Sequence, residues 1–456
     1  MTPSVECDLL IHNATLVTGT AAQPVIEGGA VAVAGGRIMA IGPEKDLLSR
    51  CRSGRTIDAG ASIVHPGLIE PHFHVVVTIS RGVFTTTSPR AYNYADWKAA
   101  LREEDENASA LLSCLELLRQ GYTHFVEPGT SFFTDAVADA VGLAGMRASL
   151  CDPYIWDRDE VLRDNPLGSK TLFARAPATA ERSAKLLGRE LRRNRDPEVL
   201  VRGHVGIYGE GTASDDLITT AAAMAKAQSV AFHQHLLYLP HVAAAETTRL
   251  GHTPLAHLER LGVLSEQLAL VHMNAVQAAD RELLRHYRPT VIWCPTQTMA
   301  LGKAQLPTMI HPHLASEGLP IALSVDAPFD WTCADVPLVA QLAARYEGLE
   351  LAPQLLLQLR TGAAAKAIGR DSDLGSLEAG KRADMVIRGR HQTAAAPGID
   401  PLHATAVLDT HGPVERVFVN GKEVLRDGEP TGFDPARAIH EAAASAKRML
   451  GRLAAG

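Results

Sequence analysis

Between residues 67 and 369, short apolar runs alternate with longer stretches in which hydrophobic positions recur with helical spacing. The helical period is clearest at 215–228, 278–287 and 309–318. Strict alternation of strand and helix, eight times over, predicts an α/β fold of the parallel (β/α)8 TIM barrel type. The predicted strands are 67–75, 123–128, 147–153, 201–208, 230–235, 268–274, 290–295 and 321–326.

Both ends of the chain have a different pattern. Residues 1–66 alternate short apolar runs with glycine turns, and similar strand texture returns in 370–430, including an Asn420-Gly421 hairpin signal. We expect these two segments to form one composite β-sandwich beside the barrel of residues 67–369. Residues 431–456 are rich in alanine and predict a C-terminal helix.

Composition narrows the class of partner. The 456-residue chain is 46% hydrophobic with a net charge of −7, and neither sign forms long runs, which disfavours nucleic acid and membrane surfaces. We therefore expect a small-molecule substrate. The six cysteines have no Cys-x-x-Cys spacing, and no secretory or transmembrane-length apolar run is present in the sequence, which predicts a cytoplasmic protein.

Two histidines, His72 and His74, end the first predicted strand. Side chains at i and i+2 of a strand point to one side, so both imidazoles can converge on one ion, although a surface pair would look the same. Other predicted strand ends carry more metal-ligating side chains, and strand ends are where barrels of this type build their sites. These side chains are His233, His235, His272 and Asp326. Such nitrogen and oxygen donors predict one divalent ion, with Zn²⁺ preferred over Fe²⁺, Co²⁺ or Mn²⁺.

Several segments together resemble the amidohydrolase superfamily: the run 66–74 (Pro-Gly-Leu-Ile-Glu-Pro-His-Phe-His), His272, the run 293–302, Asp326 and the run 374–384. The chain is most similar to the branch of metal-dependent hydrolases that contains chlorohydrolases and the cytosine, guanine and adenosylhomocysteine deaminases. The phenylurea and thiocarbamate hydrolases belong to the same branch. The resemblance covers nearly the whole chain.

The resemblance implies a single metal held by His72, His74, a fifth-strand histidine and Asp326, with His272 beside the water. The fifth-strand ligand is His233 or His235, because both side chains face the same way. In the family, a Thr-x-Ser helix start precedes this ligand by a fairly constant interval, and counting from residues 212–214 implies His235. His233 would then pack in the barrel or support a ligand by a hydrogen bond.

Position 238 departs from the family pattern. Deaminases of this branch typically have a proton-shuttling glutamate there, whereas this chain has Tyr238. A phenol with a pKa near 10 cannot act as a carboxylate-type base, but it can donate to a developing oxyanion. We therefore expect hydrolysis of an amide, carbamate or urea C–N bond, with Asp326 or His272 accepting the proton. The alternatives are a deaminase or chlorohydrolase acting on a heterocycle, and a barrel that has lost catalysis.

Further residues are candidates for substrate contact. Tyr208 and Glu210 follow the fourth strand, although a glutamate flanked by glycines is more often solvated. Asn274, Gln297 and Trp156 are polar or aromatic candidates near other strand ends. His311 and His313 fall in a predicted helix, where i and i+2 diverge, so we expect both at the surface. A homo-oligomer is expected because similar enzymes commonly form dimers or larger assemblies.

Overall fold

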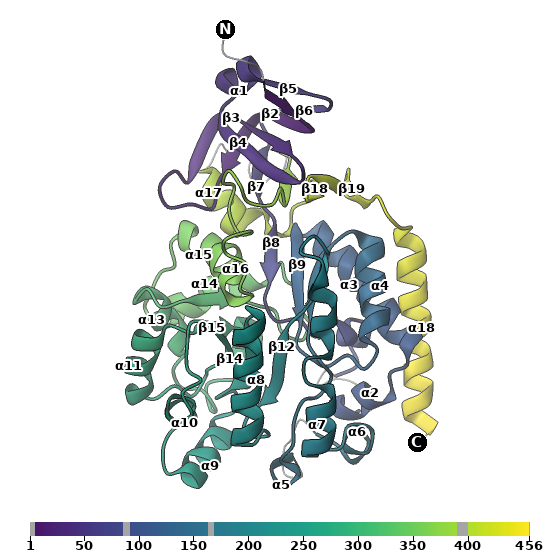
Figure 1. Cartoon of the computed structure of the whole chain (residues 1–456), viewed down its shortest axis with the longest axis vertical. Helices are drawn as coiled ribbons and strands as arrows, with labels where there is room; N and C mark the ends of the chain where they lie inside the picture. The colour runs from purple at the N-terminus through teal and green to yellow at the C-terminus, as the bar shows by residue number, and fades with distance from the viewer. Residues whose placement is uncertain (1–4, 85–91, 163–167, 390–399, 456) are drawn as a thin grey trace.

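The barrel at the centre of the molecule consists of parallel strands that pair as one sheet of four strands and one of five (Figure 1). The computed structural model describes residues 5–84, 92–162, 168–389 and 400–455. Each of the eight predicted barrel strands is present, the fourth as two pieces separated by His204. The strands are β8 (Leu68–Glu70), β9 (Tyr122–Glu127), β10 (Arg147–Leu150), β11 (Val201–Gly203), β12 (Val205–Gly209), β13 (Phe232–Leu236), β14 (Leu268–His272), β15 (Thr290–Trp293) and β16 (Ile321–Leu323).

The strand order follows the chain. Strands β8 to β11 pair in sequence, and β12 to β16 do the same. A parallel bridge between Phe73 and Asp326 brings the end of the last strand beside the end of the first. Every residue of β9, β13 and β14 is buried, because barrel strands are covered on both faces. The predicted (β/α)8 barrel is therefore confirmed.

Helices and helical turns form the outer layer around the strands (Figure 1). They are η1 (Val75–Ser80), α2 (Tyr94–Ala100), α3 (Glu103–Arg119), α4 (Thr134–Ala144), α5 (Asp159–Leu162), α6 (Lys170–Arg175), α7 (Ala180–Leu186), η2 (Arg189–Arg195), α8 (Asp215–Gln228), α9 (Pro240–Leu250), α10 (Pro254–Arg260), α11 (Ala278–Tyr287), α12 (Pro295–Leu301), α13 (Ile310–Ser316), α14 (Val336–Tyr346), α15 (Pro353–Arg360) and α16 (Gly362–Ala367).

A nine-stranded sheet, which we call the terminal sheet, lies at one end of the barrel (Figure 1). Its order is β20-β19-β18-β17-β7-β2-β3-β4, with β6 also paired to β2. Its strands are β2 (Leu9–Val17), β3 (Val25–Ala34), β4 (Arg37–Pro43), β6 (Thr56–Asp58), β7 (Ile63–Pro66), β17 (Met385–Arg388), β18 (Val414–Val419), β19 (Lys422–Arg426) and β20 (Glu429–Pro430).

Strands from both ends of the chain thus share one sheet, since β7 pairs antiparallel with β17. The Asn420-Gly421 turn joins β18 to β19 with both residues at positive φ, as the hairpin signal predicted. The folding of the sheet into a sandwich bounded at 1–66 and 370–430 stays a prediction. The remaining small elements are β1 (Val5–Cys7), α1 (Glu44–Arg50), β5 (Cys51–Ser53), α17 (Pro401–His403), η3 (Ala404–Leu408) and η4 (Asp409–His411).

A buried ion pair joins the barrel to the terminal sheet. The Arg147 guanidinium on β10 donates to both carboxylate oxygens of Asp384, at 2.7 and 3.1 Å. The Asn420 backbone N–H donates to the same carboxylate at 2.9 Å, so the β18–β19 turn is held there too. Because β7 leads directly into β8, the terminal sheet lies at the amino ends of the barrel strands. The opposite end remains available for a site.

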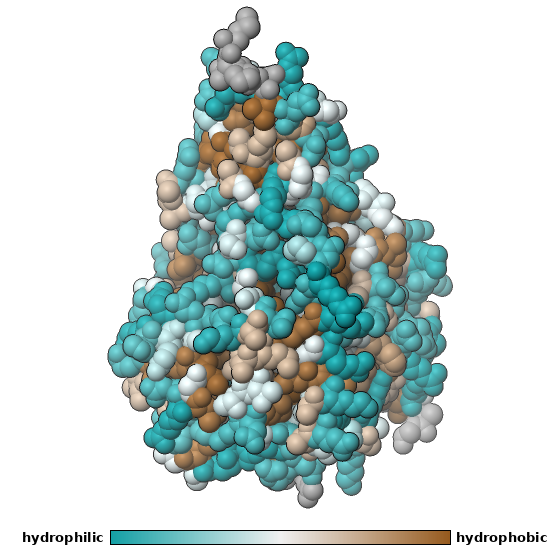
Figure 2. Space-filling model, in the orientation of Figure 1, coloured by the Kyte–Doolittle hydropathy of each residue, from teal (hydrophilic) through white to brown (hydrophobic). Residues whose placement is uncertain are grey.

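The C-terminal helix α18 (Pro435–Ala455) packs along α3 on the outside of the barrel (Figure 1). The Ser445 hydroxyl donates to the buried Asp105 carboxylate at 2.5 Å, and Arg452 pairs with the same group. On the face drawn in Figure 2, hydrophobic residues occur in separate groups among hydrophilic ones. Within the described part of the chain, no helix is long and apolar enough to cross a membrane.

Candidate metal centre and cavity

Three buried side chains meet at the carboxyl ends of β8 and β16. The Nε2 atoms of His72 and His74 lie 3.2 Å apart. Asp326 Oδ1 lies 2.9 Å from Nε2 of His74 and 3.3 Å from Nε2 of His72. Asp326 has a φ of +67°, a strained conformation for a residue with a side chain, which here follows the last barrel strand.

Strand β13 contributes a third histidine to this group. The ligand atoms of His72, His74 and His235 all lie within 4.8 Å of one another. His233 lies one layer deeper, with its Nε2 2.8 Å from Nδ1 of His72. The geometry therefore brings His235 to the candidate metal position and His233 behind it.

The hydrogen bonds behind the ring nitrogens show that this group fits a cation. His235 Nδ1–H donates to the Tyr208 carbonyl at 2.7 Å, which leaves its Nε2 without a proton in the neutral ring. The Thr130 hydroxyl gives its proton to Glu127 at 2.7 Å, so it accepts from Nδ1–H of His74 at 3.1 Å. Unprotonated imidazole nitrogens and a carboxylate that face one another in a buried space are the ligands that a divalent ion such as zinc prefers.

The protonation of these groups agrees with that fit. Burial lowers the pKa of His72 to about 4, although Asp326 opposes the shift. Burial also lowers the pKa of His235 well below its ordinary value, and the neighbouring histidines act in the same direction. Neutral imidazole is the form that binds metal.

His272 ends β14 on the other side of Asp326, with its Nε2 3.9 Å from Oδ2 of the carboxylate. Its φ of +75° is a left-handed conformation like that of Asp326, here at the end of β14. Burial lowers the pKa of His272 to about 3. The ring is therefore neutral at pH 7, and a neutral imidazole has one donor and one acceptor nitrogen.

The expectation that His311 lies at the surface is wrong. Its side chain is fully buried, its ring stacks on Trp293, and its Nε2 is hydrogen-bonded to the His272 carbonyl oxygen. His313 faces outward towards Glu347, 3.5 Å away. The side chains of His311 and His313 therefore diverge on α13, as expected for i and i+2 of a helix. One of the two helix faces, however, packs against the core.

A cavity of about 100 Å³ opens beside the candidate metal position. Several sequence candidates line it, namely Tyr208, Glu210, Tyr238 and Gln297. The full lining is His74, Tyr94, Lys98, Tyr208, Glu210, His235, Tyr238, His272, Gln297, Asp326, Ala327 and Phe329.

Glu210 is buried in this cavity, at 6% exposure, so the expectation of a solvated glutamate is wrong. It sits in a left-handed turn in which Gly209, Glu210 and Gly211 all have positive φ. A Cβ at Gly209 would lie 2.0 Å from the His235 carbonyl oxygen, so only glycine permits the turn to pack on β13. Burial raises the pKa of Glu210 to about 7.

Two other candidates support the cavity from behind. Asn274 donates to the Tyr238 carbonyl at 3.0 Å and accepts from the Thr298 hydroxyl at 3.1 Å. Trp156 packs against Tyr208, with ring centroids 5.2 Å apart, and its indole N–H donates to a backbone carbonyl. Neither residue is among the cavity lining.

Sequence reasoning missed several residues that the structure places here. Glu70 is buried behind His72 and accepts hydrogen bonds from the Ser324 hydroxyl and the Val325 N–H. It stands inside the family-like run 66–74, which was a usable signal. Tyr94 and Lys98 come from α2, and nothing in their spacing points to a cavity.

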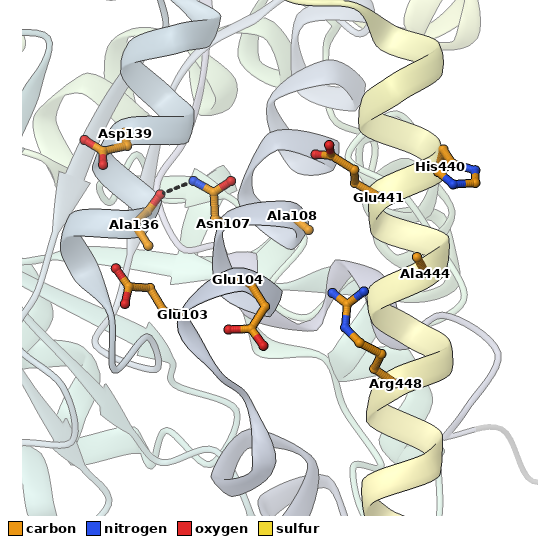
Figure 3. A pocket seen from close by; sticks show the side chains of 10 residues that line it. All are labelled: Glu103, Glu104, Asn107, Ala108, Ala136, Asp139, His440, Glu441, Ala444 and Arg448. Atoms are coloured by element: carbon orange, nitrogen blue, oxygen red, sulfur yellow. Dashed lines mark hydrogen bonds between the residues drawn. The ribbon is translucent and has the colours of Figure 1, made fainter.

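A second groove, of about 630 Å³, lies elsewhere, between α3, α4 and α18 (Figure 3). Four carboxylates, Glu103, Glu104, Asp139 and Glu441, lie around it. They are not among the side chains spaced to hold a metal ion, and the groove lies outside the strand ends. It therefore does not compete with the barrel cavity as the candidate site.

Two solved structures have the same overall fold as this chain. An adenosine deaminase from Xanthomonas campestris with bound zinc aligns with a TM-score of 0.82 and 24% identity, covering 98% of this chain and 100% of that one. A mutant of atrazine chlorohydrolase TrzN from Arthrobacter aurescens, complexed with zinc and atraton, aligns with a TM-score of 0.81 and 21% identity, covering 96% and 100%.

Curated relatives match over nearly the whole chain. A 5-methylthioadenosine/S-adenosylhomocysteine deaminase from Syntrophobacter fumaroxidans is 27% identical over 438 residues, which cover 93% of this chain and 94% of the relative. A 5'-deoxyadenosine deaminase from Methanosarcina mazei is 27% identical over 462 residues, covering 98% and 99%. The model of the amidohydrolase family matches residues 63–424, which is most of the chain. The barrel, its strand-end histidines and this match together show that the chain belongs to the amidohydrolase family.

Proposed function

We propose that this protein is a zinc-dependent hydrolase that replaces an exocyclic amino group of a small heterocycle with oxygen, releasing ammonia. The observation that carries this proposal is the buried carboxyl of Glu210, which lines the cavity beside His235 and His272. The curated relatives favour deamination over other hydrolyses, because they are deaminases and align over 94% and 99% of their length.

This proposal replaces the amide-type hydrolysis expected from the sequence. That expectation rested on the missing glutamate at position 238, which left the cavity without a proton-shuttling carboxyl. Glu210 brings a carboxyl to the cavity from the turn after β12 instead, and its Oε1 lies 3.0 Å from the Tyr238 backbone nitrogen. The cavity therefore contains a carboxyl group that can shuttle a proton, as deamination requires.

Under this proposal His72, His74, His235 and Asp326 hold the metal. Zinc suits a set of neutral imidazoles and one carboxylate, and when bound it would lower the pKa of a water molecule so that nucleophilic hydroxide is available at neutral pH. His233 supports the set by its hydrogen bond to Nδ1 of His72.

The side chains around this position can carry the protons that the reaction needs. Water oxygen forms a bond to the ring carbon that bears the amino group, and one water proton passes to Asp326. Protonated Glu210 gives its proton to the adjacent ring nitrogen. The second water proton then returns to Glu210 as the carbonyl forms. The C–N bond breaks, and Asp326 passes its proton to the amino group, which leaves as ammonia.

His272 and Tyr238 complete the site. His272 lies beside Asp326 and can hydrogen-bond the oxygen that adds to the ring. The Tyr238 ring stacks on His272, with centroids 4.1 Å apart, and fixes the imidazole plane. Gln297 is a further polar side chain that lines the cavity and can contact the heterocycle.

The test is a substrate panel with product identification. Zinc-loaded protein is incubated with aminated purines and pyrimidines and, in parallel, with anilides, carbamates and ureas. Ammonia and an oxygenated heterocycle are the expected products. Release of an aromatic amine or a carboxylic acid, with no ammonia from any aminated heterocycle, would contradict the proposal.

A further inference from the structure

Helix α2 presents two polar groups to the cavity, and neither forms a hydrogen bond with a side chain in the described part of the chain. Tyr94 and Lys98 are four residues apart, so they lie on one face of the helix, and both line the cavity. The Tyr94 hydroxyl is buried and has no hydrogen-bond partner. Lys98 is 2% exposed, and no carboxylate of the described residues forms an ion pair or hydrogen bond with its ammonium.

Two aromatic rings contact this ammonium. Lys98 Nζ lies 4.3 Å from the ring centroid of Tyr94 and 5.6 Å from that of Tyr154. Cation–π contacts recover only part of the hydration that a buried ammonium loses. Burial lowers the pKa of Lys98 to about 8, while Glu127 and Asp326 oppose the shift, so the cation prevails at pH 7. A buried, charged donor without an acceptor points to a ligand that supplies one.

The surroundings of α2 hold these groups in place. The Asn93 side chain caps the helix by accepting from the Ala95 N–H at 2.7 Å. Trp97 is fully buried. The hydroxyl of Thr171, a residue of α6, donates a hydrogen bond of 2.6 Å to the Asp96 carboxylate. A helix fixed on both sides presents its ammonium and hydroxyl at a set position, which is how a binding subsite is preorganised.

We propose that Lys98 and Tyr94 form an anion subsite that binds a carboxylate group of the substrate. This inference rests on the proposed function, since it assumes that the aminated ring occupies the same cavity. One ammonium and one hydroxyl match a singly charged carboxylate, which can accept from both. Phosphate sites collect more donors and favour arginine, and no arginine is among the cavity lining. The substrate class is therefore an aminated heterocycle with a carboxylate substituent.

The test measures binding by calorimetry, so it does not depend on turnover. Two matched pairs of probes are used: adenosine 5'-carboxylate against adenosine 5'-carboxamide, and 4-aminopyrimidine-5-carboxylate against its carboxamide. In at least one pair we expect the carboxylate to bind at least about 10-fold more tightly to the wild type, as a charge-assisted hydrogen bond implies. Adenosine 5'-monophosphate is the third arm, and tighter binding of this phosphate than of both carboxylates would overturn the carboxylate assignment.

Variants connect that preference to α2. Lys98→Met is expected to abolish the preference for carboxylate and to raise the melting temperature, because it removes a buried unpaired charge. Tyr94→Phe is expected to reduce the preference without abolishing it. Lys226→Met, at an exposed position on α8, is the matched control and is expected to change neither quantity.

The outcomes separate this inference from the proposed function. If both probe pairs bind equally, or the preference survives in Lys98→Met, the anion subsite is wrong even where ammonia is released. If the melting temperature of Lys98→Met falls, Lys98 is a structural residue and the subsite is also wrong. If ammonia is released from no heterocycle while the carboxylate preference depends on Lys98, the subsite stands and the deaminase assignment fails.

Discussion

The carboxyl of Glu210 accepts a hydrogen bond from the backbone N–H of Tyr238, with Oε1 3.0 Å from the nitrogen. Position 238 is where related deaminases typically have a glutamate. In this chain the carboxyl reaches the same part of the cavity from another strand, through a turn that two glycines allow. We propose that Glu210, which is near position 238 only in space, takes the role of the glutamate that the sequence lacks there.

The two histidines of β13 are expected to differ in their effect on metal binding. His235→Ala removes one of the three converging ring nitrogens, so zinc content after dialysis should fall to a small fraction of the wild-type value. His233→Ala removes only the support of His72, and a loss of about 10- to 100-fold in zinc affinity is expected. Metal analysis of the two purified variants decides between them. If the His235→Ala variant kept the full zinc content of the wild type, His235 would be excluded as a zinc ligand.

Tyr238 is expected to act through its ring. Tyr238→Phe keeps the stacking on His272 and should leave kcat/KM within about 3-fold of the wild type. Tyr238→Ala removes the stacked ring and should lower kcat/KM by about 10-fold. Steady-state kinetics of both variants provide the check. Equal damage by phenylalanine and alanine would instead assign the hydroxyl a role at the developing oxyanion.

Glu423 is expected to make the terminal sheet sensitive to acid. Burial opposes its ionisation, but hydrogen bonds from Arg426, Arg55 and Arg416 lower its pKa to about 2 from an ordinary value of 4.5. The ionised Glu423 carboxylate contributes its full stabilisation to the free energy of unfolding above pH 4.5. This stabilisation is lost as the pH falls towards 2, because the carboxyl takes up its proton in the unfolded chain before it does so in the folded one. Since the arginines are partly exposed, we expect Glu423 to add about 1 to 2 kcal/mol to the free energy of unfolding.

Urea unfolding of Glu423→Gln and of the wild type at several pH values tests this. The difference in the free energy of unfolding should be full at pH 6 and should shrink between pH 4.5 and 2. The control is Glu429→Gln, because the Glu429 pair with Arg119 is exposed and should contribute less than about 1 kcal/mol. A difference for Glu423→Gln that does not change with pH would show that its charge has no part in stability.

The barrel could be predicted because its strands are short, mostly buried apolar runs at regular intervals, so periodicity alone separates them from the helices. The clustering of His72, His74, His235 and Asp326 could also be predicted, since side chains at the carboxyl ends of barrel strands must converge. The choice between His233 and His235 needed the family interval, and their roles as ligand and support stay predictions. So do the homo-oligomer and the cytoplasmic location.

The rest of the cavity could not be read from the sequence. The direction of the Glu210 side chain depends on three successive left-handed residues packed against His235, and composition suggested only a solvated loop. Lys98 and Tyr94 reach the cavity from a helix in the segment after the first strand, and their position depends on tertiary packing. His311 looked like a surface residue because helical spacing shows which side chains diverge, not which face meets the core.

The most direct test of the account is ammonia release by wild type and Glu210→Gln, with zinc content measured in the same samples. We expect the wild type to release ammonia from an aminated heterocycle. We also expect Glu210→Gln to retain its zinc and to lose at least about 100-fold in kcat/KM, since the amide cannot carry the proton. Glu181→Gln, on exposed α7, should match the wild type. Ammonia release by Glu210→Gln at the wild-type rate would contradict the account.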